Sequence, residues 1–139
     1  MRNQYAVQAA QMQTFCLTKN YLLYLSIVDS TLHSLNALQF NKLVFLTHLL
    51  LQNDSIVMIH PHAFVGLKSI RYINLKMNPI TQLSVTKLTT LESLQYLDVS
   101  NTKILKIEMH EKIKLHQLLA RHTLLTKISG VSPESKDRN

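Results

Sequence analysis

Apolar residues recur along this chain with a period of 24 residues, and this period constrains the fold more than any other feature of the sequence. Each copy of the repeat carries apolar residues at its positions 1, 4 and 6, a small polar residue at position 9, and apolar residues at positions 11 and 14. One unit of this size cannot bury its apolar side chains alone, so neighbouring units stack and share a core. Four copies begin 24 residues apart, at Leu22, Leu46, Ile70 and Leu94, and a fifth begins 21 residues later, at Leu115.

The repeat divides the chain into three expected regions. Residues 22–128 form a solenoid. Residues 1–21 are an N-terminal segment, in which residues 5–17 predict a helix that covers the first coil. Residues 129–139 are polar and predict a disordered tail. Because an uncapped solenoid exposes strand edges and apolar side chains at its ends, we expect self-association wherever residues 1–21 leave the first coil uncovered.

Positions 3 to 7 of each repeat predict a short strand, with the side chains at positions 4 and 6 pointing into the core. The polar side chain at position 9 is expected to bond backbone groups of the stacked coils. Asparagine is the usual residue there, and only Asn78 keeps it. The other copies hold Ser30, Asp54, Thr102 and Thr123.

The remaining strand positions, 3, 5 and 7, point away from the core and form the concave face of the sheet. Position 3 lines up three tyrosines and one histidine, and strands about 4.8 Å apart would make these rings a stepped row. Tyrosine is favoured at protein interfaces, although cross-strand packing also favours it on sheets. The candidate partner-binding residues are Tyr24, Ser26, Val28, His48, Leu50, Gln52, Tyr72, Asn74, Lys76, Tyr96, Asp98, Ser100, Gln117, Leu119 and Arg121.

Other chemistry finds little support in the sequence. Asn53-Asp54-Ser55 is a candidate N-glycosylation sequon. The histidines have no cysteine or carboxylate cluster beside them, so we expect them at the surface and expect no metal site; they are His60, His62, His110, His116 and His122. No nucleophile, base and orienting group are brought together by the repeat, so we expect no enzyme and no cofactor.

The composition limits the classes of binding site and partner that we expect. The chain has two glycines, too few for a glycine-rich phosphate loop, and one cysteine, Cys16, so it forms no internal disulfide. The net charge is +7, but the basic residues are scattered instead of lining one face, so we expect no nucleic-acid partner. No apolar run is long enough to span a membrane. Residues 1–7 do not read as a signal peptide.

The sequence resembles leucine-rich-repeat proteins over residues 22–128. Residues 61–67 read Pro-His-Ala-Phe-Val-Gly-Leu, similar to the Ala-Phe-x-Gly-Leu half of extracellular repeats. Residues 94–128 resemble the last repeats of the glycoprotein-hormone receptors, where a shortened repeat precedes a Leu-Ile-Ala-Arg-like strand, here Leu118-Leu119-Ala120-Arg121. The resemblance implies an α/β solenoid: a leucine-rich-repeat horseshoe of about five repeats with a short-stranded parallel sheet on its concave face.

For such a receptor ectodomain, the resemblance implies a cystine-knot hormone gripped by the concave face, with Asp98 and Arg121 among the hormone-facing residues. Because the cysteine-rich flanks and the seven helices of that family are missing here, we expect a fragment or a truncated form. The compartment would then be extracellular or membrane-tethered. The alternative is a cytoplasmic leucine-rich-repeat adaptor that binds other proteins, which the single cysteine favours.

Overall fold

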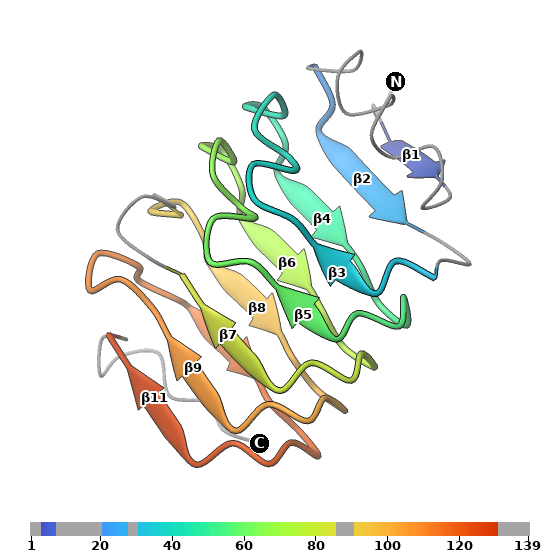
Figure 1. Cartoon of the computed structure of the whole chain (residues 1–139). Helices are drawn as coiled ribbons and strands as arrows, with labels where there is room; N and C mark the ends of the chain where they lie inside the picture. Colours follow the sequence, from blue (N-terminus) through green and yellow to red (C-terminus); the bar gives the residue numbers. More distant parts are fainter. Residues whose placement is uncertain (1–3, 8–20, 28–30, 86–90, 131–139) are drawn as a thin grey trace.

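The computed structural model describes residues 4–7, 21–27, 31–85 and 91–130. These residues form a solenoid of stacked coils with strands in two layers (Figure 1). The strands are β1 (Gln4–Val7), β2 (Tyr24–Ile27), β3 (Ser34–Leu35), β4 (His48–Leu50), β5 (Met58–Ile59), β6 (Tyr72–Asn74), β7 (Gln82–Ser84), β8 (Tyr96–Asp98), β9 (Lys106–Glu108), β10 (Gln117–Leu119) and β11 (Lys127–Ser129).

One layer is a six-stranded parallel sheet in the order β1-β2-β4-β6-β8-β10. The register of this sheet follows the repeat, since position 3 of each copy lies opposite position 3 of the next. The pairs are Tyr24 with His48, His48 with Tyr72, Tyr72 with Tyr96, and Tyr96 with Gln117. The last step is the shortened one that the sequence predicts. The five predicted strands of the repeats are therefore confirmed, with the predicted spacing.

The opposite layer consists of strands and turns. A two-stranded sheet pairs β3 with β5, and a three-stranded sheet runs β11-β9-β7. In the described residues this side contains no helix, so the solenoid is confirmed while its convex side is built from short strands where an α/β repeat would have helices. In Figure 1 these strands lie in front of the six-stranded sheet.

The core between the layers holds the apolar positions of the repeat. Side chains at positions 1, 4 and 6 of the second and third copies are no more than 1% exposed; they are Leu46, Leu49, Leu51, Ile70, Ile73 and Leu75. Phe40 and Phe64, which share one position of successive repeats, stack with their ring centroids 6.3 Å apart. Because each coil buries its apolar side chains against the next, the core is continuous along the solenoid.

Asn78 provides the polar bonds that link two coils inside this core. Its Oδ1 accepts hydrogen bonds from the backbone N–H groups of Asp54 (2.9 Å) and Ile56 (3.0 Å) in the preceding coil. Its Nδ2 donates to the carbonyl oxygens of Leu51 (2.7 Å) and Leu75 (2.9 Å). The predicted role of position 9 is thus confirmed at Asn78, which is 1% exposed.

The threonines at the same position make a smaller set of bonds. The Thr102 hydroxyl donates to the Val99 carbonyl at 2.7 Å and accepts from the Ile104 N–H at 3.4 Å, both within its own coil. Asp54 is fully buried at this position. Of Asn78, Thr102 and Thr123, Asn78 is therefore the residue whose side chain bonds the preceding coil.

Turns at two places in the repeat use left-handed backbone. The residue before position 9 has a positive φ in four copies: Asn53 (58°), Met77 (61°), Asn101 (55°) and His122 (53°). Gly66 has a φ of 96°, and a Cβ there would lie 2.5 Å from the carbonyl oxygen of Asn41 in the preceding coil. The glycine of the Ala-Phe-x-Gly-Leu segment is therefore required by close packing of two turns.

Two expectations about the ends need correction. The predicted helix over residues 5–17 is wrong at residues 5–7, because β1 pairs in parallel with β2 and extends the sheet by one strand; residues 8–17 lie outside the described residues. The tail predicted to start at Ser129 is wrong at that residue, because β11 includes Ser129 and pairs with β9. Residues 131–139 lie outside the described residues.

Candidate functional site

The concave face carries an aromatic row, which we define as Tyr24, His48, Tyr72, Tyr96 and His116. The rings of Tyr24 and His48 stack with centroids 4.1 Å apart and 14° between their planes. His48 stacks on Tyr72 at 5.6 Å, and Tyr72 tilts against Tyr96 at 6.5 Å. The expected stepped row of rings is present, because the parallel register brings position 3 of each strand beside the next.

The far end of the row contains one ring that the sequence analysis did not place there. Gln117 lies opposite Tyr96 in the register, as predicted, and the ring of His116 also meets Tyr96, edge-on with centroids 6.0 Å apart. His116 is the residue immediately before β10, and its N–H donates to the Gln95 carbonyl at 2.8 Å. His116 stands at position 2 of its repeat, just before the strand, and Arg71 holds the same position in the third copy. Including position 2 among the candidate positions would have found it.

Burial and neighbouring charge set the ionisation of two rings in the row. Partial burial, and next the positive charge of Arg71, lower the pKa of His48. Partial burial, and next the negative charge of Asp98, raise the pKa of Tyr72, against a smaller opposing hydrogen bond with Asn74. Both shifts favour the uncharged forms of the rings.

Three predicted contact residues are buried beneath the face. Asn74, Asp98 and Ser100 are 5%, 8% and 7% exposed, so they do not offer the free side chains expected of them. The Asn74 Oδ1 accepts from the Lys76 N–H at 3.0 Å, and the Asp98 Oδ1 accepts from the Ser100 N–H at 2.9 Å. Their short polar side chains fold back onto the strand ends, as Asn and Asp commonly do.

The other candidates are accessible. Tyr96, Gln52 and Arg121 are exposed, and the remaining members are half-buried; those are Tyr24, Ser26, His48, Leu50, Tyr72, Lys76, Gln117 and Leu119. Val28 lies outside the described residues. The described members of the predicted set therefore lie along the strands of the six-stranded sheet and at their ends, with the three buried residues beneath the accessible ones.

The modification and metal candidates lie elsewhere. Asn53 is exposed at the turn after β4, while Asp54 of the same sequon is fully buried. His60 and His62 adjoin each other, with the His60 Nδ1 accepting from the His62 N–H at 3.0 Å. Among the described residues no group of three or more histidine, cysteine or acidic side chains could hold a metal ion.

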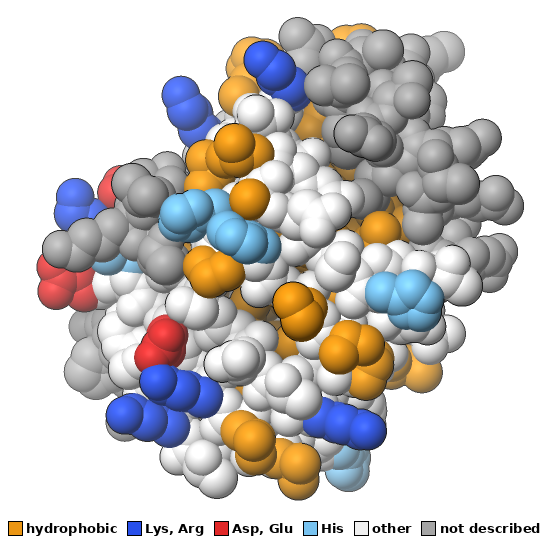
Figure 2. All heavy atoms as spheres, in the orientation of Figure 1, with side chains coloured by type: hydrophobic (Ala, Val, Ile, Leu, Met, Phe, Trp, Pro, Cys, Tyr) orange, Lys and Arg blue, Asp and Glu red, His pale blue; other side chains and the backbone are white. Residues whose placement is uncertain are grey.

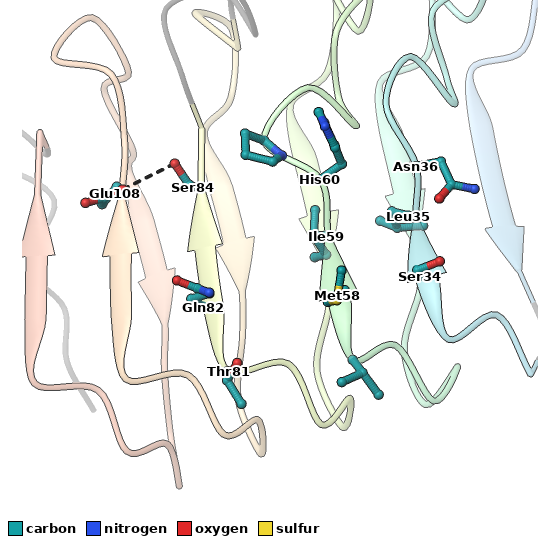
Figure 3. Close-up of a pocket in the computed structure, with 12 residues that line it drawn as sticks. Ser34, Leu35, Asn36, Met58, Ile59, His60, Thr81, Gln82, Ser84 and Glu108 are labelled. Atoms are coloured by element: carbon teal, nitrogen blue, oxygen red, sulfur yellow. Dashed lines mark hydrogen bonds between the residues drawn. The ribbon is translucent and has the colours of Figure 1, made fainter.

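A groove of about 520 Å³ lies on the opposite side, where the two smaller sheets meet without hydrogen bonding between β5 and β7. Figure 3 shows Leu35 and Ile59 along it, with Ser84 joined to Glu108 on its far side. Glu108 also forms an ion pair with Lys106. The hydrogen bond from Lys106 is the main cause that lowers the pKa of the Glu108 carboxyl. No feature of the repeat pattern predicts this groove, because the groove depends on a break between the strands of two coils.

The surface around this groove is mixed in character. Figure 2 shows hydrophobic side chains in separate small patches among polar ones on the side that carries β3, β5, β7 and β9. Met58, which lines the groove, has the largest exposed fraction among the described large hydrophobic side chains, at 69%. A continuous row of rings in contact is found on the concave face instead.

Comparison with known proteins agrees with this architecture. Residues 20–80 match the leucine rich repeat family. The chain folds as a leucine-rich-repeat solenoid. No curated protein matches its sequence. Among solved structures, a chain of the TLR13–ssRNA13 complex resembles it with 17% identity and a TM-score of 0.40, over 96% of this chain and 26% of that chain.

This leucine-rich-repeat solenoid thus spans about a quarter of that chain's length. None of its described segments forms a helix with the length and apolar character needed to cross a membrane. Solenoids of this kind typically present an extended concave surface to their ligands.

Proposed function

We propose that this chain is a non-catalytic scaffold that binds a protein ligand on its concave face. The aromatic row is the observation that carries the proposal. Its rings are fixed by their neighbours yet remain accessible from the concave side, with Tyr96 39% exposed. Tyrosine offers a large contact area with few rotatable bonds and a polar tip, the properties of interface hot spots.

The rigidity of the face supports the same proposal. Asn74 and Asp98 bond the backbone at the ends of β6 and β8, and the Asn74 Nδ2 also donates to the Gln52 Oε1 at 3.1 Å. These bonds hold the strand ends before a ligand arrives. A preorganised surface loses less conformational entropy on binding than a flexible one.

The Thr47–His48 pair is the arrangement nearest to a catalytic one on this face. The Thr47 Oγ1 lies 3.0 Å from the His48 Nδ1, as a nucleophile and a base would. However, the same hydroxyl donates its single proton to the Leu23 carbonyl at 2.9 Å. The pair therefore favours a structural role that links β2 to β4, and supports the non-catalytic proposal.

In its finer form, we propose a fragment or truncated form of a glycoprotein-hormone-receptor-like ectodomain. The similarity of residues 94–128 to the final repeats of those receptors supports it. The alternative is an intracellular adaptor, which the single cysteine supports. Sequencing the transcript distinguishes them: flanking cysteine clusters and seven apolar helices favour the receptor, and a reading frame that stops at Asn139 without them favours the adaptor.

Site-specific photocrosslinking in cells that express the protein tests the coarser proposal. Benzoylphenylalanine at position 96, in place of Tyr96, should form a discrete covalent product with one protein. The matched control carries the same group in place of Met58, which is exposed on the opposite side. Crosslinking to a protein only from position 58, or from neither position, would contradict the proposal.

A further inference from the structure

Basic side chains flank the aromatic row on both sides. Arg71 immediately precedes β6, on the side where the strands begin, and its charge acts on His48. Lys76 and Arg121 follow β6 and β10, on the side where the strands end. The ion pairs recorded among the described residues join Lys106 to Glu108 and Lys112 to Glu92, so these three cations take part in neither.

The backbone fixes the position of two of these cations. The Lys76 N–H donates to the Asn74 Oδ1, and the Lys76 carbonyl accepts from the Asn53 N–H at 3.1 Å. The Arg121 N–H donates to the Ser100 Oγ at 3.2 Å, and its carbonyl accepts from the Asn101 N–H at 2.8 Å. Their side chains therefore start from anchored positions beside the row.

One carboxylate, Asp98, lies on the described part of this face against three cations, and, after burial, its charge raises the pKa of Tyr72. Asp98 is 8% exposed, and its Oδ1 is engaged by the Ser100 N–H. The accessible concave face therefore presents an aromatic centre with Arg71 on one margin and Lys76 and Arg121 on the other. Such a surface attracts an anionic partner electrostatically.

The geometry of the rings separates the two main classes of anionic macromolecule. Single-stranded nucleic acid binds aromatic platforms by stacking its bases on free ring faces. Here both faces of His48 are occupied, by Tyr24 at 4.1 Å and by Tyr72 at 5.6 Å. Tyr24 and Tyr72 each turn one face to His48 as well, so these three rings offer few free faces for bases to stack on, which favours protein side chains as the ligand.

We infer, building on the proposed function, that the ligand of the concave face is an acidic protein surface. Its apolar or aromatic side chains would lie along the row, and its carboxylates would reach Arg71 on one margin and Lys76 and Arg121 on the other. Affinity should decrease as salt rises, because the charged margins remain partly exposed to solvent.

The test measures binding of the whole chain to defined polymers by fluorescence anisotropy. A copolymer of glutamate and tyrosine should bind, and raising the salt from about 0.05 M to about 0.5 M should weaken it at least several-fold. The double variant Lys76→Glu/Arg121→Glu should bind it at least tenfold more weakly. The control Lys42→Glu/Lys68→Glu makes the same charge change at exposed residues in the turns between strands and should bind as the native chain does.

Three results would overturn the inference: no binding of the copolymer, equal weakening by both double variants, or tighter binding of single-stranded oligothymidine than of the copolymer. The last result would assign the face to nucleic acid. The proposed function fails separately. If the crosslinked partner from position 96 loses affinity on Tyr96→Ala but not on Lys76→Glu/Arg121→Glu, then the concave face binds protein and only the acidic partner is wrong.

Discussion

The ring of His48 lies flat against the ring of Tyr24, with their centroids 4.1 Å apart and their planes 14° from parallel. The contact joins β2 to β4 in register, and the opposite face of His48 meets Tyr72 at 5.6 Å. An ionisable ring thus occupies the second position of a row of tyrosines. Its protonation state is coupled to the packing of the concave face.

Acidification should destabilise the protein through His48. Burial and the charge of Arg71 lower its folded pKa below the ordinary 6.5, so below that pH the unfolded chain binds more protons at this site than the folded one. The free energy of unfolding should therefore fall as pH drops from about 7.5 to about 5.5. In His48→Gln that fall should be smaller, as measured by urea unfolding at both pH values. The expectation would be contradicted if the free energy of unfolding of His48→Gln fell between the two pH values by as much as that of the native chain.

Asn78→Ala should destabilise the fold by about 3 kcal/mol, because it leaves the buried N–H groups of Asp54 and Ile56 without their acceptor and two carbonyls without a donor. Thr102→Val is the comparator at the same repeat position. Its hydroxyl makes bonds within one coil, so the loss should be about 1 kcal/mol. Denaturant unfolding measures both, and equal losses would mean that Asn78 does not link the coils.

Met77→Gly should stabilise the protein by about 0.5 kcal/mol or more, because a left-handed backbone strains a long side chain by about 1–2 kcal/mol. Met77 has a φ of 61° and is 50% exposed, while the same turn position in other copies holds Asn53, Asn101 and His122. Asparagine and histidine are enriched in this conformation.

Lys103→Gly is the control for that substitution. Lys103 is exposed in a neighbouring turn and is not among the residues with positive φ. Glycine there gains no relief of strain and adds freedom to the unfolded chain, so a small loss of stability is expected. A stabilising Lys103→Gly, or a destabilising Met77→Gly, would show that backbone strain at Met77 is not the cause.

Gly66→Ala should cost about 2 kcal/mol or more. Its Cβ would lie 2.5 Å from the carbonyl oxygen and 2.6 Å from the Cα of Asn41, both of them backbone atoms that cannot turn aside. Thermal unfolding followed by circular dichroism measures the shift. Lys68→Ala, at an exposed residue two positions along, should change stability by less than about 0.5 kcal/mol. Similar melting temperatures for the two variants would mean that the turns of Gly66 and Asn41 can move apart at little cost in free energy.

The sequence predicted the part of the fold that depends on the repeat. Leu49 and Ile73 recur with the period, so their burial and the parallel register followed directly from it. The N-terminal strand could not be predicted in the same way, because residues 4–7 lie outside the apolar pattern and their pairing with β2 is a tertiary contact. The break between β5 and β7 depends likewise on contacts between coils.

The candidate site was predicted as a column of residues but not in its chemistry. Alternation along the strands placed Tyr72 and Tyr96 in one row. The same alternation treated Asp98 as a free surface carboxylate, whereas its side chain folds back to bond the Ser100 N–H and is buried. His116 was missed because it stands just before β10, at a position that the predicted column of strand residues did not include, although its ring meets Tyr96.

The most direct test of the central claim is the affinity of Tyr72→Ala/Tyr96→Ala for the protein captured from position 96. If the concave row binds that partner, the variant should lose about 2 kcal/mol or more of binding free energy while keeping its circular dichroism spectrum. Phe45→Ala/Met58→Ala, at two exposed residues outside the row, should bind as the native chain does. Native affinity in the tyrosine variant, or loss of folding together with binding, would contradict the claim and mark the row as structural.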